Sequence, residues 1–265
     1  MESANNNVSL EFEKRFGGIA RLYSLEDFRK IQTANVVIVG LGGVGSWIAE
    51  ALARTGVGKI ALMDLDDVCE SNINRQIHGL QHTIGKAKVS VLAERIQQIN
   101  PKCKVKEFHR FYTAKESDAF WETQWDCVAD AIDSLDNKCH LLAHAIKKNI
   151  SVVTVGGAGG KIDPSQITIK DLNNTHGDNL MRQVRKKLRK EYSFPNSRTI
   201  KYNIPCVFSP EPLRYPRSNG SSCKSPDQGE SLSLNCAGGL GSVTHLTGAF
   251  GFFAAYQIIE KIYQR

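Results

Sequence analysis

A glycine-rich loop between a strand-like segment and a helix-like segment most limits how this chain can fold. Residues 36–39 (Val-Val-Ile-Val) form a short β-branched run of the kind found in buried parallel strands. The loop that follows has the pattern Gly-x-Gly-x-x-Gly, and its glycines are Gly40, Gly42, Gly43 and Gly45. Such glycines allow a tight turn and let backbone N–H groups approach a phosphate at a helix N-terminus. The sequence therefore predicts a nucleotide-binding unit.

Strand-like and helix-like segments alternate beyond this loop. Residues 46–54 are expected to be helical, as are 86–100 and 135–149, and further strands are expected at 59–64, 104–108, 126–132 and 151–155. Strands that alternate with helices at this spacing form parallel sheets. We therefore expect an α/β fold, a Rossmann-like, doubly wound and mostly parallel sheet with helices on both faces.

The chain divides by composition into three parts. Residues 1–14 are polar and are expected to be a flexible tail, whereas residues 15–265 are expected to form a single domain. Within it, residues 15–160 would be the nucleotide-binding core. Residues 161–265 would bind the substrate and mediate dimerisation, with a possible strand at 166–169 and a helix at 179–192.

A long loop and an apolar helix are expected near the end of the chain. Six of the eight prolines lie between positions 195 and 226, which predicts a loop over 194–230. Residues 243–259 are apolar and helix-like, but they contain His245, Thr247 and Gln257 and are only marginally long enough to cross a bilayer. We favour a buried core or dimer helix, and peripheral membrane contact stays open.

The cysteines indicate a reducing compartment. Their number, seven, is odd, their spacing is irregular, and no Cys-x-x-Cys pair occurs. Together with an N-terminus that lacks an apolar signal segment, this predicts reduced thiols in the cytoplasm and no structural zinc. Cys206, Cys223 and Cys236 could act in persulfide or thioester chemistry, but we favour buried or incidental thiols.

Basic residues are concentrated in one stretch. Between positions 180 and 202 eight basic residues are opposed only by Glu191, and this stretch accounts for the whole net charge of +7. The basic residues are Arg182, Arg185, Lys186, Lys187, Arg189, Lys190, Arg198 and Lys201. A local excess of this size favours a polyanionic partner, and the alternative is a solvated helix face.

The residues beyond the glycine loop favour ATP over a dinucleotide. Asp64 ends the second expected strand, where a carboxylate accepts ribose hydroxyls. Attack at the α-phosphate builds charge on the departing pyrophosphate, so the site needs cations and a metal-binding carboxylate. Arg75 and Lys88 could supply the cations and Asp133 the magnesium ligand. A hydride-transfer enzyme needs neither, so the sequence predicts ATP and Mg²⁺.

Residues 36–136 resemble the ubiquitin-activating superfamily, which includes the ThiF- and MoeB-type adenylating enzymes of thiamine and molybdopterin biosynthesis. The resemblance rests on Gly-x-Gly-Gly-x-Gly, the strand-end aspartate, Ser-Asn-x-x-Arg-Gln at 71–76, a helix lysine and an Ala-x-Asp element. Members adenylate a carboxylate with ATP. The resemblance implies that the four loop glycines form the site together with Asp64, Asp66, Asn72, Asn74, Arg75, Gln76, Lys88 and Asp133.

The same resemblance implies that part of the site comes from a second subunit. An arginine near the N-terminus of the partner often completes the site in this superfamily, and Arg15 and Arg21 are the two candidates here. Arg75, Lys88, Asp133 and one of these two would be the catalytic groups. A homodimer is therefore expected.

A narrower resemblance, to the tRNA threonylcarbamoyladenosine dehydratases, covers nearly the whole chain from Arg15. It rests on residues 15–18, 66–68, 156–164 and 206–209. It implies that ATP activates the carboxylate of a threonylcarbamoyl side chain in the tRNA anticodon loop, and that the side chain then cyclises with loss of water. The tRNA would contact Arg182, Arg185, Lys186, Lys187, Arg189 and Lys190. Two departures, Asn179 in place of proline and Lys161, lie outside the expected ATP site.

Three other functions stay open at this level. The first is adenylation of the C-terminus of a ubiquitin-like or sulfur-carrier protein, which would make a sulfur-transfer or carrier protein the partner. The second is a nicotinamide-dependent oxidoreductase, which would leave Arg75 and Lys88 without ligands. The third is a catalytically inactive tRNA-binding protein.

Overall fold

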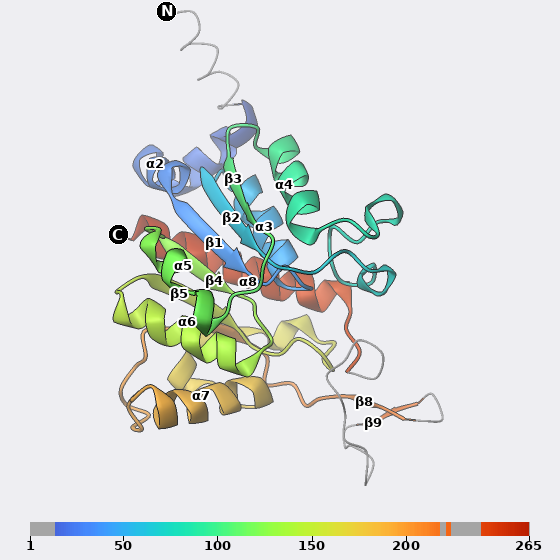
Figure 1. Ribbon diagram of the computed structural model, residues 1–265, viewed down its shortest axis with the longest axis vertical. Coiled ribbons are helices and arrows are strands. Elements are labelled where there is room, and N and C mark those ends of the chain that lie inside the picture. Colours follow the sequence, from blue (N-terminus) through green and yellow to red (C-terminus); the bar gives the residue numbers. More distant parts are fainter. Residues whose placement is uncertain (1–13, 218–220, 224–239, 265) are drawn as a thin grey trace, which may run out of the picture.

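A seven-stranded sheet forms the centre of the protein in a computed structural model that describes residues 14–217, 221–223 and 240–264 (Figure 1). The strand order is β3-β2-β1-β4-β5-β7-β6, and only β6 runs antiparallel to its neighbour. The strands are β1 Asn35–Val39, β2 Lys59–Met63, β3 Lys104–Phe108, β4 Cys127–Asp130, β5 Ser151–Val155, β6 Thr168–Asp171 and β7 Pro205–Phe208. The expected α/β fold with a mostly parallel sheet is confirmed.

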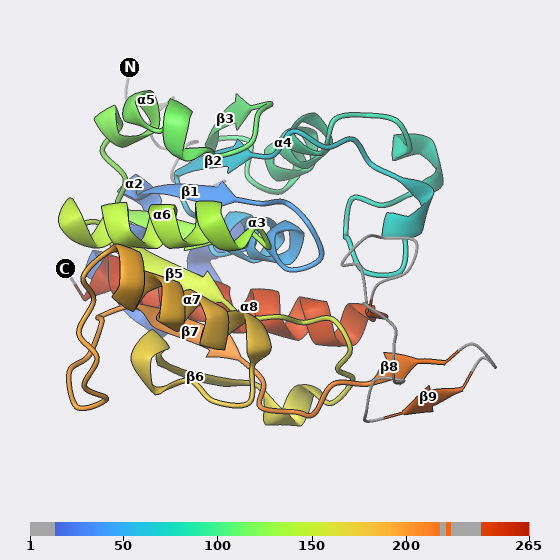
Figure 2. The same cartoon turned by 60° about the horizontal axis from the view of Figure 1, so that its bottom comes forward.

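Helices cover both faces of this sheet because its strands are apolar on both sides. In β1, Val36 and Ile38 belong to one buried cluster, and Val37 and Val39 belong to the other. The first cluster includes residues of α2 Leu25–Thr33, α3 Gly45–Arg54, α4 Lys88–Ile99 and α8 Thr244–Tyr263. The second includes residues of α5 Asp118–Glu122, α6 Leu135–Lys147 and α7 Asn179–Glu191, of which α6 and α7 pack side by side (Figure 2).

Short elements complete the described chain. Residues 14–23 are helical. The 3-10 helices are Glu70–Asn72, Gln81–Thr83, Ala114–Glu116, Pro164–Gln166 and Leu172–Asn174, and a two-stranded ribbon pairs β8 Tyr215–Pro216 with β9 Ser222–Cys223. Most of the expected 1–14 tail, parts of the expected 194–230 loop and Cys236 lie outside the described residues.

The sheet grows in one direction from β1 to β3 and in the other direction from β4 onward, so β1 and β4 flank a topological switch point. This switch point determines where a ligand site is expected. Val39, the last residue of β1, is in register with Met63 and with Asp130. The glycine loop after β1, Asp64 after β2 and Asp133 after β4 therefore leave the sheet at the same edge. Ligands of open parallel sheets bind at this kind of switch point, outside the carboxyl ends of the strands.

The expectation of one long loop over 194–230 is wrong where β7 occurs. Pro205 begins β7, and Cys206, Val207 and Phe208 are fully buried between β5 and β6. Proline has no N–H to donate, but the first residue of a strand tolerates it. Because prolines are dense on both sides of this short strand, composition alone predicted a loop.

Helix α8 packs its apolar side against the sheet and α3, as expected for a core helix. Leu246, Phe250, Ala254 and Ile258 are fully buried. No helix among the described residues combines the length and the hydropathy needed to span a bilayer. The opposite side of α8 exposes aromatic rings, namely Phe252, Phe253 and Tyr256.

Candidate active site

The glycine loop turns so tightly that two of its glycines cannot carry a side chain. Gly40 has a φ of 89°, and a Cβ there would lie 2.7 Å from the carbonyl oxygen of Ala131. A Cβ on Gly45 would lie 1.8 Å from the carbonyl oxygen of Gly40. Gly42, by contrast, has no atom within 4 Å of such a position. The loop therefore presents open backbone at Gly42, three residues before α3 begins.

Asp64 fastens this loop to the end of β2. Its side chain is buried, Oδ2 accepts a hydrogen bond of 2.7 Å from the Leu41 N–H, and Oδ1 accepts one of 2.9 Å from the Asp66 N–H. An ionised carboxylate has about four acceptor positions, so these two bonds leave capacity for ribose hydroxyls. The structure thus adds a role in shaping the loop to the ribose contact that the sequence predicts.

The polar stretch after β2 folds back so that Asp66 meets Lys88. Their side chains pair at 2.8 Å, with the lysine side chain 6% exposed and the aspartate side chain 53% exposed. The Lys88 N–H also donates to the Asp66 carbonyl at 3.1 Å, and an isolated bridge joins Asp67 to Ala87. Lys88 is therefore a nearly buried cation at the start of α4, held by a carboxylate that solvent still reaches.

Arg75 lies in the same connection between β2 and α4, residues 64–87, here called the crossover, and it is close to the glycine loop. A Cβ on Gly43 would be 3.5 Å from the Arg75 side chain. Its Nη1 donates to the Ser71 carbonyl at 2.7 Å and to Asn74 Oδ1 at 2.9 Å. Asn72 is buried, and its Oδ1 accepts from the Cys69 N–H at 3.1 Å. Asn72 and Asn74 therefore shape the crossover that presents Arg75.

Unpaired buried polar atoms gather around this site. Among the described residues, the buried side-chain atoms without a partner are Ser46 Oγ, Gln76 Oε1 and both ring nitrogens of His78. Burial and the nearby Lys88 ammonium lower the pKa of His78 to about 4, so the imidazole is neutral at pH 7. An unpaired buried polar atom costs about 1–3 kcal/mol. Such atoms in the first turn of α3 and in the Arg75 crossover fit a site that a bound molecule completes.

His78 is the residue here that sequence reasoning missed. It lies two positions after Gln76 in a polar stretch, and nothing in its spacing sets it apart from an ordinary loop histidine.

Asp130 ends β4 and Asp133 follows three residues later, and of the two only Asp133 is accessible to solvent. Asp130 is fully buried, and its Oδ2 pairs with Lys138 Nζ at 2.8 Å and accepts from the Thr154 hydroxyl. Asp133 is exposed. The described residues contain no cluster of three His, Cys, Asp or Glu side chains able to hold a metal. A Mg²⁺ held by one or two carboxylates and mainly by substrate phosphates fits Asp133.

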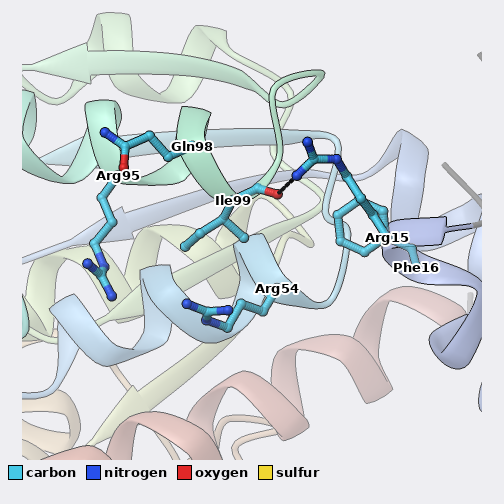
Figure 3. A pocket seen from close by; sticks show the side chains of 6 residues that line it. All are labelled: Arg15, Phe16, Arg54, Arg95, Gln98 and Ile99. Carbon is cyan, nitrogen blue, oxygen red and sulfur yellow. Dashed lines mark hydrogen bonds between the residues drawn. The ribbon is translucent and has the colours of Figure 1, made fainter. Parts of the chain in front are cut away.

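Arg15 lies at the far end of α3 from the glycine loop. Its Nη1 donates to the Ile99 carbonyl at 3.3 Å, and it lines a cavity of about 410 Å³ (Figure 3) with Phe16, Arg54, Arg95, Gln98 and Ile99. Arg54 ends α3, and a helix of ten residues is about 15 Å long. The arginines there neutralise buried Glu50 and two helix C-termini. Arg15 therefore does not reach the glycine loop of its own chain.

Arg21 lies in the same N-terminal helical segment. Its side chain is exposed, and it folds back so that Nη1 would lie 3.5 Å from a Cβ on Gly17. Both candidate arginines therefore lie in one helical segment, residues 14–23.

Three of the six expected tRNA contacts on the basic helix are fully exposed. Arg182, Lys186 and Lys190 are exposed, and they lie four residues apart on one face. The other three bond to neighbouring side chains. Arg185 is buried and bonded to the Thr175 hydroxyl, half-buried Lys187 pairs with Asp136 and Glu191 at the surface, and half-buried Arg189 bonds Tyr202 and Asn173. Burial also lowers the pKa of Arg185.

A buried ion pair ties this helix to the glycine-rich segment after β5. Asp178 caps α7 by accepting from the Met181 N–H at 2.9 Å, and its other oxygen accepts from Lys161 Nζ and the Gly157 N–H, each at 3.0 Å. Lys161 also donates to the Ser209 carbonyl at 2.8 Å. Lys161 is thus a fully enclosed cation, and Asn179 takes the first helical position, where proline is favoured.

Of the three cysteines considered for sulfur chemistry, Cys206 and Cys223 lie among the described residues. Cys206 is fully buried in β7, and burial raises its pKa well above the ordinary value. Cys223 lies half-buried in β9. Thiolates are the reactive form, so Cys206 is poorly suited to nucleophilic chemistry.

Comparison with known proteins identifies the family of this chain. The model of the ThiF family matches residues 18–265. The chain belongs to the ThiF family. Within it, the chain is 42% identical over 254 residues to the tRNA threonylcarbamoyladenosine dehydratase of Haemophilus influenzae, covering 96% of this chain and 95% of that one. It is 43% identical over 257 residues to the dehydratase of Escherichia coli, covering 96% of each.

Solved structures agree with this ThiF-family assignment. The E. coli dehydratase in complex with ATP superposes with a TM-score of 0.84 at 41% identity, over 95% of both chains. The same enzyme has been solved with AMP, with a TM-score of 0.81 at 40% identity and the same coverage. The chain therefore belongs with the tRNA threonylcarbamoyladenosine dehydratases among ThiF-family proteins.

Proposed function

We propose that this ThiF-family chain catalyses the ATP-dependent dehydration of threonylcarbamoyladenosine in tRNA to its cyclic form. The observation that carries the proposal is the arrangement of Lys88, Arg75 and the open backbone of Gly42 around one sheet edge. Near full-length similarity to dehydratases, one of them solved with ATP and with AMP, supports the substrate.

The chemistry is a carboxylate activation followed by ring closure. An oxygen of the side-chain carboxylate attacks the α-phosphorus of ATP, and the bond to pyrophosphate breaks. An atom of the same side chain then attacks the activated carbonyl carbon, and AMP leaves. The carboxylate oxygen departs with AMP, so the modified adenosine loses one water overall. The second step is intramolecular, which makes it fast once the first has occurred.

The residues divide this work by charge. Arg75 and Lys88 stabilise the negative charge that develops on the departing pyrophosphate. Asp64 binds the ribose hydroxyls, and the backbone around Gly42 binds phosphate oxygens. Asp133 would hold Mg²⁺, which neutralises phosphate charge when bound.

A second copy of the chain completes the site in this proposal. Arg15 cannot reach its own glycine loop, so an arginine from the N-terminal helical segment of a partner, Arg15 or Arg21, would enter instead. The exposed aromatic side of α8, formed by Phe252, Phe253 and Tyr256, supports a homodimer because such a patch is costly to leave in water.

The decisive experiment uses tRNA that carries the linear modification. The protein is incubated with this tRNA, ATP and magnesium, the tRNA is digested, and the nucleosides are weighed. We expect the modified adenosine to lose the mass of one water, and only when ATP is present. An unchanged mass would overturn the proposal. Pyrophosphate exchange that depends on a carrier protein instead of tRNA would favour the adenylation of such a protein.

Removing the three exposed charges of α7 is expected to weaken tRNA binding. Cations that bind phosphates release counterions, so each cation removed from the interface lowers the slope of log affinity against log salt by about 1. In the variant R182Q/K186Q/K190Q, filter binding at several salt concentrations should give a slope about three units smaller. The matched control K59Q/K104Q/K106Q removes three exposed lysines of β2 and the edge strand β3. If the salt-dependence slopes of the two variants were equal, α7 would not be part of the tRNA interface.

A further inference from the structure

The peptide group of Arg75 is held from two sides by parts of the chain remote from it in sequence. Its carbonyl oxygen accepts a hydrogen bond of 3.1 Å from Trp47 Nε1, in the first turn of α3. It also accepts one of 3.2 Å from Thr247 Oγ1, in the first turn of α8. Thr247 Oγ1 also lies 3.3 Å from the carbonyl oxygens of Val243 and Thr244, and the Arg75 oxygen is the nearest of these three acceptors for its one hydrogen.

The residue before Arg75 is attached to the same end of α8. Asn74 Nδ2 donates to the Ser242 carbonyl at 3.1 Å, and the Asn74 carbonyl accepts from the Thr244 hydroxyl. The guanidinium of Arg75, in contrast, bonds only within its own crossover in the described chain, to Ser71 and Asn74. The position of the guanidinium therefore follows the position of its backbone.

The glycine loop meets these groups at Gly43. A Cβ there would lie 3.2 Å from Thr247 Cγ2 and 3.5 Å from two methylene carbons of Arg75. The Arg75 stem and the Thr247 methyl group thus pack over the same bare stretch of loop backbone. A shift of Arg75 by a fraction of an ångström would change how its guanidinium meets a phosphate on the loop.

We propose that Trp47 and Thr247 are positioning residues of the nucleotide site, which hold the Arg75 carbonyl so that the guanidinium lies beside the glycine loop. The proposal rests on the role of Arg75 in the proposed function. It assigns α8 a task in the ATP reaction that it performs through the Arg75 backbone. A misplacement of about 1 Å can cost about 10²-fold in rate, so two modest hydrogen bonds have a large effect on turnover.

Packing around Trp47 supports a fixed indole. Where α8 passes it, the helix has Gly248 and Gly251, and a Cβ on Gly251 would lie 2.5 Å from Trp47 Cβ. The ring of Phe252 meets the indole edge-on at a centroid distance of 5.8 Å. Helix α8 thus packs against the Trp47 indole.

The test compares T247V, W47F and the double variant for tRNA-dependent ATP turnover. Valine keeps the Thr247 shape and phenylalanine keeps an aromatic ring, so each removes one hydrogen-bond donor. A neutral hydrogen bond is worth about fivefold, so we expect that loss in kcat for each single variant. The double variant should lose about 10²-fold. T247S, which keeps the hydroxyl, should retain wild-type kcat.

Matched controls remove equivalent bonds elsewhere. T33V removes a hydroxyl that donates to the Arg29 carbonyl in α2, and W125F removes an indole N–H that donates to the Phe120 carbonyl. Both should keep wild-type kcat, and the melting temperatures of all variants are compared with it.

A second arm separates positioning from general damage. In an R75A background, removing both donors should cause no further loss of kcat, because nothing remains to be positioned. A further loss equal to that in the wild-type background would mean a merely structural role. Wild-type kcat in W47F/T247V, with R75A impaired, would overturn this inference alone. Wild-type kcat in R75A would instead contradict the site assignment in the proposed function.

Discussion

Replacing Lys88 with methionine is expected to lower kcat for tRNA-dependent ATP turnover by about 10²–10³-fold, the usual cost of removing one preorganised charge from a developing anion. The Lys88 side chain is 6% exposed, so its ammonium acts where water screens it poorly. Release of pyrophosphate, measured with saturating tRNA, gives the rate.

The fold should survive this substitution, because the partner Asp66 is more than half exposed and stays hydrated without the lysine. K86M is the matched control, since Lys86 is exposed two residues earlier, and it should keep full turnover. K88R, which retains a cation, should recover part of the rate. If K88M kept wild-type kcat, Lys88 would have no part in the chemistry.

Replacing Lys138 with methionine is expected to lower the free energy of unfolding by about 3–5 kcal/mol, because it leaves a buried carboxylate without its counterion. Asp130 and Lys138 are both fully buried, and their side chains pair at 2.8 Å. Lys138 Nζ also donates to the Ile132 carbonyl at 2.9 Å, which would lose that bond. Urea unfolding followed by circular dichroism measures the change.

K187M is the surface counterpart of this variant. Lys187 pairs with Asp136 and Glu191, whose side chains are 79% and 42% exposed, so its loss should leave the unfolding midpoint nearly unchanged. Equal midpoints for K138M and the wild type would show that Asp130 finds another partner or is protonated in the folded protein.

The sheet could be predicted from sequence because its strands carry their own signal. Apolar runs such as 36–39 are followed by glycines or carboxylates where the strands end, and the intervening helices have apolar faces. Strand β7 could not be found in this way. It has four residues, begins with Pro205 and lies in a proline-rich stretch, so its pairing with β5 and β6 depends on tertiary contacts alone.

Part of the site could be predicted from sequence where the local backbone geometry requires a particular residue type. The tight loop requires glycine at positions 40 and 45, and this requirement is visible in the Gly-x-Gly-x-x-Gly pattern. The ion pair of Asp66 with Lys88 was not predicted, because the sequence pattern marks the two residues separately. The accessibility of the basic helix was not predictable, because charge alone does not reveal that Arg185 faces the core. The hydrogen bonds from Trp47 and Thr247 to the Arg75 carbonyl could not be predicted from sequence either, because they join residues from distant parts of the chain.

Helix α8 has a consequence for biosynthesis. It is the last described element of the chain, yet hydroxyl groups in its first turn bond the carbonyls of Asn74 and Arg75, which are synthesised about 170 residues earlier. The ribosome therefore makes most of the parallel sheet before the crossover has its final supports. Contacts of such long sequence separation form late in folding, so a nascent or C-terminally truncated chain would carry a glycine loop but an unfinished nucleotide site. In the proposed mechanism, the nucleotide site is complete only after α8 has docked.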